Sequence, residues 1–583
     1  MATDTPNAAF YFAGHNYRTA GDMVVGRQSA SGGFLKGFIC HGGTDTLYCY
    51  SNEATGHREF AEFAREAGAT QSLRGFLPPS IDRIAEVGTL FRPGPGLGPL
   101  AWNRRHFYVR GFSLVGITHT VSDAAALDAI GDILVAPLET WDALVCTSKS
   151  VQAVVLGVLE DWAGYLEARF GEKPKLPRLP IIPLGVDSEA LAVRGNNGAA
   201  RADLRRRMNI ADGDIAILYA GRLDHVEKAN PVPMLLAAET AARATKKKLH
   251  LLQAGQASTP EMAAAFKQAA TALAPSVNHH FIDGARTDLY DGAWAAADIF
   301  ISLSDNIQES FGLTPIEAMA AGLPCVVSDW NGYRESVLDS EQGFTVPTAM
   351  PPAGTGQELG YLYGSGFASY SVFTGAASQS TAVDPAVVAA ALGRLIEDGA
   401  LRERMGAAGR KRAAEVYDWR HVVAGHQSLW AELAELRAGA PECTPRPEGT
   451  QAHPLRPDPF AAFRRHPTLA IGGGTMLSAA GAIDSEGLKV LMSSELATPL
   501  ATLLLDVTDT AALLSRLSKD GPLSAEALGE DVPDAKRVPF HLTLGWLAKM
   551  GFVQVASGDY EGSGGGITPP FGASISWKRL SDD

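Results

Sequence analysis

Short, continuous apolar runs alternate with stretches of helical periodicity over most of this sequence, and no other feature restricts the fold as much. A strand that is apolar at every position has to be covered on both faces, as in a parallel sheet between layers of helices. Ile215–Ala220 is the clearest run of this kind. The other predicted strands are Ala8–Ala13, Leu47–Tyr50, Leu114–Thr118, Ala143–Thr147, Leu179–Pro183, Leu249–Ala254, His280–Asp283, Asp298–Ser302 and Pro324–Ser328. We therefore predict an α/β protein.

The alternation is interrupted twice. Arg194–Arg201 is a polar stretch typical of an interdomain linker, so we predict two Rossmann-like domains, at residues 1–193 and 203–440. Gly354–Ser380 is rich in Gly, Ser and Tyr, and we interpret it as a loop inserted into the second domain. The sequence leaves open whether this insertion shapes a binding site or lies on the surface.

A different composition begins after the second domain. Pro441–Pro467 contains seven prolines, which favour an extended chain without a core of its own, so residues 441–484 are predicted to be a linker. Residues 485–583 then form a small α+β domain. Its predicted helices Asp509–Lys519 and Asp534–Met550, and a β hairpin over Val553–Trp577, are similar in pattern to a winged helix.

Charge and cysteine usage exclude several classes of protein. A formal net charge of −14 argues against broad binding to nucleic acids or anionic membranes, since both require a basic surface. The five cysteines include no CxxC pair, which fits a reduced cytosolic chain better than a disulfide framework or a zinc site. We see no signal peptide and no uncharged apolar run of the ~18–20 residues that a spanning helix requires. We expect a cytoplasmic protein, with peripheral contact to the inner face of a membrane left open.

Two cations follow the buried run Ile215–Ala220. Gly221 and Arg222 come immediately after it, and Lys228 stands six residues beyond Arg222, just ahead of a predicted helix. Ligands of open α/β sheets bind at the carboxyl ends of the strands, and two fixed cations beside a helix N-terminus suit a diphosphate. Either residue taken alone is better explained as an ordinary solvated charge.

A second motif runs from Glu309 to Glu317 and leads into a helical string, Ala318–Gly322. Gly312 permits a close backbone approach, and Pro315 suits the first turn of a helix. The helix start then offers N–H groups to an anion, with Glu317 about one turn inside and Glu309 on the preceding loop. A carboxylate accepts two hydroxyl hydrogen bonds at once and so suits a sugar or ribose diol. Glu317 by itself is equally explained as an acid stabilised by the helix dipole.

These motifs resemble glycosyltransferase family 4, and the resemblance is most specific in the second domain. The residues that carry it are Gly32-Gly33, Ile182–Asp187, Arg222, Lys228, Asp298, Glu309–Glu317, the string AMAAGLPCVVSD at Ala318–Asp329, Gly332–Glu335 and Tyr417–Trp419. The resemblance implies a GT-B fold, in which two Rossmann-like domains face each other across a cleft. It also implies a retaining hexosyltransferase that uses a nucleotide-diphosphate sugar and an acceptor hydroxyl. Bacterial members often build polysaccharides or glycoconjugates.

The resemblance implies a role for each cation. Arg222 and Lys228, next to Gly221, would hold the donor diphosphate and stabilise its charge as the glycosidic bond breaks. A metal does this in other transferases, so no metal or other cofactor is expected here. The expected partners are the donor and an unidentified glycan, lipid or small-molecule acceptor.

The resemblance also assigns the acidic motif. Glu317 would bind the nucleotide ribose and Glu309 the donor sugar hydroxyls, while backbone amides near Phe311, Gly312 and Leu313 would face the sugar and phosphate. Family members are thought to react by front-face attack without a protein nucleophile, the leaving phosphate helping to deprotonate the acceptor. Glu309 is therefore expected to position the sugar and not to attack it.

The first domain carries a less specific half of the predicted site. Gly32 and Gly33 would open a helix and approach the diphosphate from across the cleft. His119 follows the predicted strand Leu114–Thr118, where relatives often carry a histidine near the donor sugar. Thr120 stands where relatives commonly have an aspartate, and a structural histidine at a strand end is the alternative explanation for His119.

Two other functions remain open. The chain could be a regulatory protein whose winged-helix-like domain binds DNA or a partner protein, or a sugar-nucleotide-binding protein without transferase activity. The presumed recognition helix carries four basic residues, Lys536, Arg537, His541 and Lys549. From Asp506 onward, however, eleven acids stand against seven bases, a net charge of −4, so we expect a protein partner and no nucleic acid. Donor base, sugar, acceptor, linkage and oligomeric state are not determined by the sequence.

Overall fold

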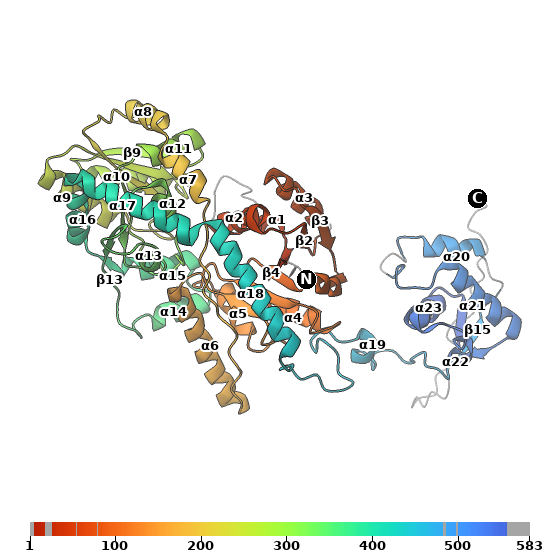
Figure 1. Cartoon of the computed structure of the whole chain (residues 1–583). Helices are drawn as coiled ribbons and strands as arrows, with labels where there is room; N and C mark the ends of the chain where they lie inside the picture. The colour runs from red at the N-terminus through yellow and green to blue at the C-terminus, as the bar shows by residue number, and fades with distance from the viewer. Residues whose placement is uncertain are drawn as a thin grey trace, which may run out of the picture. The chain divides into compact units, whose positions relative to one another are not determined.

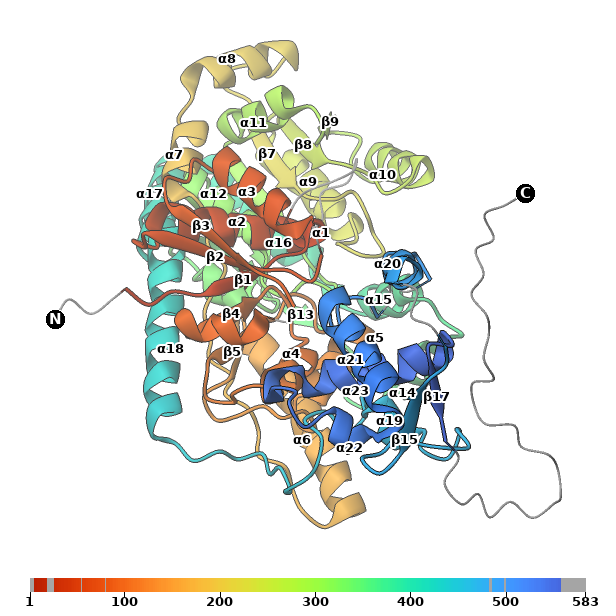
Figure 2. The ribbon, with the colours of Figure 1, turned by 90° about the vertical axis from the view of Figure 1, so that its right-hand side faces the viewer.

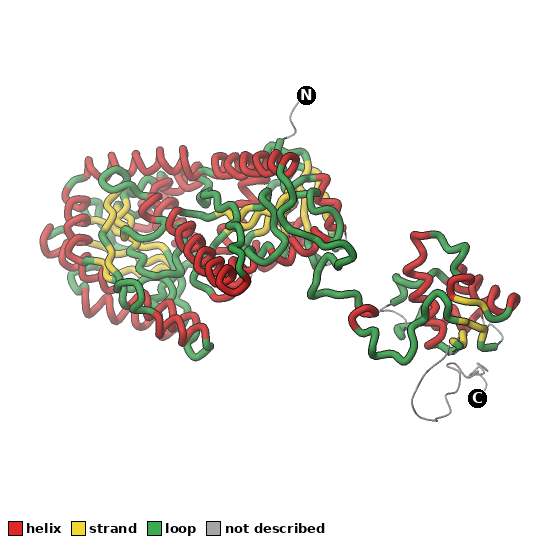
Figure 3. The backbone as a smooth tube through the Cα atoms, turned by 90° about the horizontal axis from the view of Figure 1, so that it is seen from below, coloured by secondary structure: helices red, strands yellow, loops and turns green. Residues whose placement is uncertain are grey.

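The computed structural model describes residues 5–17, 26–53, 55–78, 80–481, 485–496 and 500–556. The chain divides into two units, Met1–His453 and Pro454–Asp583. The first unit contains two parallel sheets of six strands each, and Figure 3 shows helices enclosing the strands of both. The prediction of two Rossmann-like domains is confirmed.

The first sheet has the strand order β3-β2-β1-β4-β5-β6, with every pairing parallel. This is the Rossmann order, in which the sheet grows in opposite directions from β1 and β4. Its strands are β1 (Ala9–Tyr11), β2 (Thr46–Tyr50), β3 (Ser72–Phe76), β4 (Thr89–Arg92), β5 (Ser113–Ile117) and β6 (Ala143–Val145). The helices are α1 (Gly14–Tyr17), α2 (Gly26–His41), α3 (Gly56–Glu66), η1 (Ser80–Glu86), α4 (Gly98–Arg105), α5 (Ala124–Asp132) and α6 (Lys149–Phe170).

Two sequence expectations about this domain are wrong in detail, and two of its strands were not predicted. Leu179–Pro183 is not a strand: its neighbourhood pairs with β6 only through isolated bridges, such as Cys146 with Ile181. Arg194–Arg201 is not a polar linker, because α7 (Ser188–Gly195) and α8 (Gly198–Arg207) occupy it. Strands β3 and β4 were not predicted; β3 is an edge strand that is exposed at four of its five positions and so lacks a continuous apolar run.

The second sheet repeats the Rossmann order as β12-β11-β10-β7-β8-β9, again with parallel pairings. All six residues of β7 are buried, as the apolar run predicts. The strands are β7 (Ile215–Ala220), β8 (Leu249–Gly255), β9 (Asn278–Asp283), β10 (Ile299–Ser302), β11 (Cys325–Ser328) and β12 (Gly343–Val346). The helices are α9 (Val232–Thr245), α10 (Pro260–Leu273), α11 (Thr287–Ala296), α12 (Leu313–Ala321), α13 (Tyr333–Ser336), α16 (Pro385–Glu397), α17 (Gly399–Arg412), η2 (Ala413–Tyr417) and α18 (Trp419–Gly439).

Helix α18 returns from the second domain to the first and packs against α2 (Figure 2). Its first residue, Trp419, lies in a slot made by three glycines. A Cβ atom at Gly33 would come within 2.8 Å of the indole, one at Gly37 within 2.7 Å, and Gly185 also has no room for one. Glycine at these positions lets the two domains and the returning helix approach closely.

The expectation that Gly354–Ser380 is a loop is wrong, because it forms two helices, α14 (Gln357–Gly364) and α15 (Tyr370–Gln379) (Figure 1). The short strands β13 (Thr348–Ala349) and β14 (Ala382–Val383) pair antiparallel at its base. The rings of Tyr363 and Phe373 stack at 4.6 Å and join the helices. Two of its three tyrosines, Tyr363 and Tyr370, therefore form a small aromatic cluster with Phe373. We call residues 354–380 the helical insertion.

The second unit contains a three-stranded antiparallel sheet of order β16-β15-β17. Its elements are α19 (Pro459–Ala462), β15 (Met476–Ala479), α20 (Ser485–Met492), α21 (Val507–Asp520), β16 (Leu523–Ser524), α22 (Ala525–Leu528), η3 (Asp534–Lys536), α23 (Arg537–Lys549) and β17 (Val553–Val555). The predicted hairpin beyond β17 lies outside the described residues from 557 onward. The winged-helix likeness stays a prediction.

The predicted linker 441–484 is not uniformly extended. The backbone N–H of Cys443 donates to Glu139 of the first domain at 2.6 Å, and Thr444 donates to the same carboxylate at 3.2 Å. At its other end β15 already belongs to the small sheet of the second unit. The high proline content indicated that this part of the chain has no core of its own, but it did not show at which residues the stretch begins and ends.

One buried ion pair ties the first sheet to its helices. Arg104 of α4 and Asp142 are each 1% exposed and form two parallel hydrogen bonds of 2.7 Å. Asp142 also accepts from the backbone N–H of Leu114 at 2.8 Å.

Within the described residues, no helix is both long and apolar enough to cross a lipid bilayer.

Candidate active site

The predicted second-domain residues meet where the second sheet reverses its order. β7 and β10 are neighbours, and their connections leave in opposite directions; in open α/β sheets this arrangement leaves a ligand-binding crevice at the carboxyl ends of the two strands. Residues 221–230 follow β7 and residues 303–312 follow β10, so both loops line this crevice. The same strand order places Glu309 opposite Lys228, although 81 residues separate them.

Arg222 links the two loops. One terminal nitrogen donates to the Glu227 carboxylate at 3.3 Å. The other donates to the Glu227 carbonyl and to the Gln308 side chain, both at 3.3 Å. Tyr219 at the end of β7 donates its hydroxyl to the Arg222 carbonyl at 2.9 Å. The guanidinium is therefore oriented, and about a quarter of the side chain is still exposed to a ligand.

Lys228 forms an ion pair with Glu309, and both side chains are largely buried. Burial opposes the ammonium charge, but the neighbouring carboxylate outweighs it and raises the pKa of Lys228. Lys228 therefore carries its charge at neutral pH. Arg222, Lys228, Glu227 and Glu309 together form a set of four charges whose sum is zero in the free protein.

Gly312 precedes α12 with φ of +84°, a conformation that glycine adopts without strain. A Cβ atom here would also collide with the ring of Tyr333. Tyr333 is fully buried, and its hydroxyl bonds to Ser302 at 2.9 Å. Phe311 is buried beside it, and Leu313 begins α12, so the predicted backbone segment lies at the crevice.

Glu317 lies one turn inside α12 and differs from Glu309. Its side chain makes no hydrogen bond or ion pair with any residue that the structure describes. Burial raises its pKa, while the charges of Arg194 and Lys228 act in the opposite direction. A half-buried carboxylate without a protein partner beside the cations is open to hydroxyl donors from a ligand.

The expectation that Gly32 and Gly33 open a helix is wrong. Helix α2 already includes Gly26, so both glycines lie in its second turn. Gly33 contacts Trp419, as described above, and a Cβ at Gly32 would come within 2.8 Å of the Tyr17 carbonyl. Close packing accounts for both glycines, and their predicted contact with a diphosphate has no support in this geometry.

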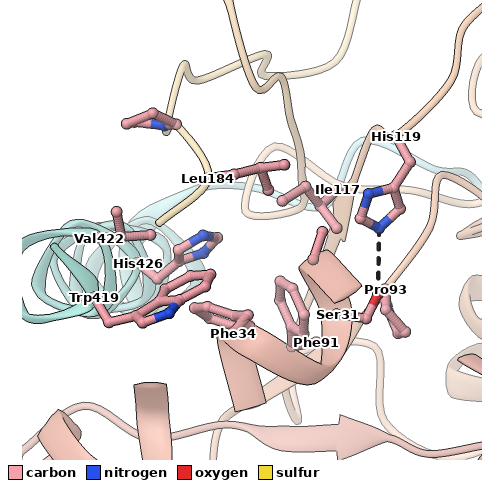
Figure 4. Close-up of a pocket in the computed structure, with 12 residues that line it drawn as sticks. Ser31, Phe34, Phe91, Pro93, Ile117, His119, Leu184, Trp419, Val422 and His426 are labelled. Atoms are coloured by element: carbon pink, nitrogen blue, oxygen red, sulfur yellow. Dashed lines mark hydrogen bonds between the residues drawn. The ribbon is translucent and has the colours of Figure 1, made fainter. Parts of the chain in front are cut away.

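His119 lies at the rim of a small apolar hollow between the first domain and α18. Figure 4 shows its imidazole pointing to Ser31, 3.4 Å from the serine Oγ. The hollow has room for roughly one water molecule. Buried His426 lines its far side, and burial lowers the pKa of this histidine to about 3, so it is neutral. The remaining lining is mainly apolar, from Phe34, Phe91, Pro93, Ile117, Leu184, Trp419 and Val422.

The first domain also contacts the acidic loop of the second. Ser148, the N-cap of α6, donates its hydroxyl to the carbonyl of Ser310 at 3.2 Å. The backbone N–H of Lys149 donates to the Glu335 carboxylate at 2.7 Å. The start of α6 thus contacts the second domain at Ser310, the residue after Glu309, and at Glu335.

Sequence reasoning missed Glu227 and Gln308. Each directly precedes a predicted residue, Lys228 and Glu309 respectively, but nothing in the sequence shows that both turn toward Arg222. In the part of the chain that the structure describes, no group of three or more His, Cys, Asp or Glu could hold a metal ion. The expectation that no metal is required stays a prediction.

The basic residues of the presumed recognition helix are partly neutralised. Lys536 lies 2.5 Å from an Asp509 carboxylate oxygen, and Arg537 lies 2.9 Å from Asp534. These pairs reduce the positive charge that the helix would present to DNA.

Known glycosyltransferases match part of this chain in sequence. The chain is 28% identical over 195 residues to the D-inositol 3-phosphate glycosyltransferase of Geodermatophilus obscurus, covering 33% of this chain and 41% of that protein. It is 26% identical over 190 residues to the lipopolysaccharide 1,2-N-acetylglucosaminetransferase of Salmonella typhimurium, covering 32% of this chain and 48% of that one. The chain thus spans less than half the length of these curated relatives.

Among solved structures, Anabaena HepE in complex with UDP aligns with 73% of this chain and 100% of its own, at 14% identity and a TM-score of 0.48. Residues 200–353, which contain β7 to β12 and all predicted second-domain site residues, match the family described as glycosyl transferases group 1.

Proposed function

We propose that this protein is a glycosyltransferase that moves a sugar from a nucleotide-diphosphate sugar to an acceptor hydroxyl. The observation that carries the proposal is the charge arrangement at the crevice of the group 1 domain. Two oriented cations, Arg222 and Lys228, are joined there by Glu317, a carboxylate on which the Lys228 charge acts and which has no hydrogen-bond or ion-pair partner among the described residues. Cations for a diphosphate next to an acceptor for hydroxyls match the chemistry of a nucleotide sugar.

The donor would replace contacts that already exist in the free protein. Its diphosphate takes the place of the Glu309 carboxylate on Lys228 and adds to the contacts of Arg222. Glu309, released from its ion pair, then accepts hydrogen bonds from sugar hydroxyls. Glu317 accepts the ribose diol. In a half-buried site these charged contacts are stronger than in water, which favours tight donor binding.

For the chemical step we propose transfer with retention of configuration and without a bound metal. The bond between the anomeric carbon and the phosphate oxygen breaks, and its electron pair stays with the diphosphate. The acceptor oxygen bonds to the anomeric carbon on the same face, and its proton passes to a phosphate oxygen. Arg222 and Lys228 stabilise the departing charge. His119, which has its own hydrogen bond to Ser31, would face the donor sugar.

The acceptor class is a separate part of the proposal. Relatives by sequence include transferases named for inositol phosphate and for lipopolysaccharide, so a glycan, lipid or small polyol at the cytoplasmic face of a membrane is a reasonable acceptor. We propose a role in polysaccharide or glycoconjugate synthesis. Radiolabelled sugar transfer to a membrane extract, compared with a soluble polyol panel, tests this part.

A donor panel tests the core of the proposal. UDP-, GDP- and ADP-sugars are screened for thermal stabilisation and for release of the nucleoside diphosphate, with and without EDTA. Ligand at 100 times its Kd stabilises the folded state by about 2.7 kcal/mol. We expect one base to stabilise the protein, and turnover to persist in EDTA.

Two variants complete this test. Lys228→Met should lose donor affinity, whereas Lys411→Met, the same change at a 74%-exposed lysine of α17, should not. Glu309→Ala should lose turnover. Full turnover in the Glu309 variant, or no stabilisation by any donor, would contradict the proposed function, while binding without turnover in the wild type would point to a sugar-nucleotide-binding protein.

A further inference from the structure

Two consecutive residues of the helical insertion, Tyr370 and Ser371, begin α15 beside the candidate active site. Successive residues of an α-helix point about 100° apart, so neighbours in sequence reach different surroundings. Tyr370 contacts the first domain and Ser371 the second. One helical turn therefore touches both halves of the site.

Ser371 acts on the cation side. Its hydroxyl donates to one carboxylate oxygen of Glu227 at 2.5 Å, and the other carboxylate oxygen of Glu227 accepts from Arg222 at 3.3 Å. The chain Ser371–Glu227–Arg222 thus runs from the insertion to a predicted diphosphate ligand. Without the serine, Glu227 would be free to change rotamer and Arg222 would lose a fixed partner.

Tyr370 acts on the side of His119. Its hydroxyl lies 2.8 Å from the Ser122 hydroxyl and 3.5 Å from that of Thr120, the residue directly after His119. Tyr363 of α14 accepts the backbone N–H of Ala124 at 3.0 Å. The segment between β5 and α5, on which His119 is carried, is therefore held by two tyrosines of the insertion.

The base of α15 is anchored well enough to support these contacts. Gly375 packs so closely that a Cβ atom there would come within 2.9 Å of Val226. Buried Ser378 donates to the buried carboxylate of Asp305 at 2.7 Å. Both anchors lie on the loops that follow β7 and β10, so α15 is seated on the same loops that carry the cations and Glu309.

We infer that Ser371 and Tyr370 are positioning residues for the proposed transferase: Ser371 sets Arg222 for the donor diphosphate, and Tyr370 sets the His119 segment for the sugar. The inference rests on the proposed function and names residues outside the motifs that suggested it. On this inference the helical insertion helps to shape the site and is not merely a surface element.

Glu227 has two conceivable effects, and the geometry favours one. A carboxylate near a phosphate site can compete with the ligand, but Glu227 holds Arg222 through both its side chain and its carbonyl. Gln308 completes the set from the opposite loop. Three acceptors on one guanidinium fix its plane and leave its other N–H groups for the diphosphate. Glu227 therefore orients Arg222 and does not compete with the ligand.

Binding of nucleoside diphosphates tests the Ser371 half by calorimetry. UDP, GDP and ADP are first titrated into the wild-type protein, and the one that binds is used for the variants. Ser371→Ala should raise its Kd roughly 5- to 10-fold, the effect of losing one ordinary hydrogen bond. Ser371→Thr, which keeps the hydroxyl, should restore affinity, and Glu227→Gln should weaken binding. Ser380→Ala is the control, because this exposed hydroxyl bonds only within α15.

The outcomes separate the two proposals. If no nucleoside diphosphate binds the wild type, the proposed function fails and this inference with it. If one binds and Ser371→Ala binds it equally well, the positioning role alone is wrong. Tighter binding by Glu227→Gln would show that Glu227 competes with the ligand, and would also overturn the inference.

Turnover tests the Tyr370 half. Tyr370→Phe removes only the hydroxyl, so we expect kcat with the matched donor to fall about 5-fold or more, as for one lost hydrogen bond, while the Kd of the nucleoside diphosphate stays unchanged. Tyr361→Phe on α14, at a 72%-exposed tyrosine, is the control. An unchanged kcat, or a loss of kcat that is matched by an equal loss of diphosphate affinity, would contradict separate roles for the two residues.

Discussion

Replacing Asp305 with asparagine would measure what it costs to seat α15 on the second domain. Asp305 is 2% exposed, and its carboxylate accepts from Ser378 at 2.7 Å and from the backbone N–H of Asn230 at 3.4 Å. Burial outweighs these bonds and raises the pKa of Asp305 from 3.8 to about 6. The folded protein therefore binds the proton more tightly than the unfolded chain does, and stability is lost as pH rises through 6.

The size of the effect follows from the two pKa values. The difference between a pKa of 3.8 in the unfolded chain and about 6 in the folded protein corresponds to roughly 3 kcal/mol between pH values well below 3.8 and well above 6. Between pH 8 and pH 5 the linkage relation gives about 1.4 kcal/mol of added stability for the wild type. Asparagine does not titrate, so the Asp305→Asn variant lacks this contribution, and the stability difference between the two proteins should change by that amount.

Thermal unfolding followed by tryptophan fluorescence at pH 5, 6, 7 and 8 is the assay. For a cooperative unit of about 150–250 residues, 1.4 kcal/mol moves Tm by roughly 3–6 °C. The wild type should gain this much relative to Asp305→Asn as the pH falls from 8 to 5. Asp212→Asn, a change at an exposed aspartate, should show no such pH-dependent gap. A gap that is constant with pH, or one that grows in favour of the variant on acidification, would refute the reasoning.

Three further expectations concern other parts of the chain. Gly312→Ala should lower the free energy of unfolding, measured with urea, by about 1–3 kcal/mol from backbone strain alone, and further because the new Cβ collides with the Tyr333 ring. The control is Gly356→Ala, because Gly356 has open space around it; equal losses for the two variants would contradict the argument. Arg104→Met should lower the free energy of unfolding by about 3–5 kcal/mol, because the charge of Asp142 stays buried without its partner. Adding Asp142→Leu should recover much of that loss. A loss below about 1 kcal/mol would show that the pair is not desolvated as the structure indicates. A chain that ends at His453 should keep the Tm of its first unit and the affinity for the nucleoside diphosphate. A lower Tm would show that residues after His453 stabilise the first unit, and weaker binding would show that they contribute to the site.

Local sequence pattern predicted the second domain better than the first. A run such as Ile215–Ala220 is apolar throughout because both of its faces are covered, and that signal needs no knowledge of its neighbours. The exposed edge strand β3 has no such signal and was missed. The helices of Gly354–Ser380 were also missed, since their stability comes from an aromatic stack and from seating on other loops, not from periodicity.

The candidate site divides in the same way. Arg222, Lys228, Glu309 and Glu317 follow the ends of strands, and parallel strands bring all their carboxyl ends to one edge, so the sequence by itself determined that these groups gather. The strand order decides which of these groups pair with each other. β7 and β10 are neighbours only because of how the crossover connections pack, and the sequence does not show this.

The first-domain half and the insertion were decided by tertiary structure alone. Gly32 and Gly33 were predicted to open a helix, but they lie inside α2, where Gly32 packs against the Tyr17 carbonyl and Gly33 against Trp419. Ser371 carries no signal in the sequence, because its significance comes from a contact 144 residues away. Periodicity and spacing report the surroundings of a residue along its own element, whereas contacts between elements arise only when the whole chain has packed.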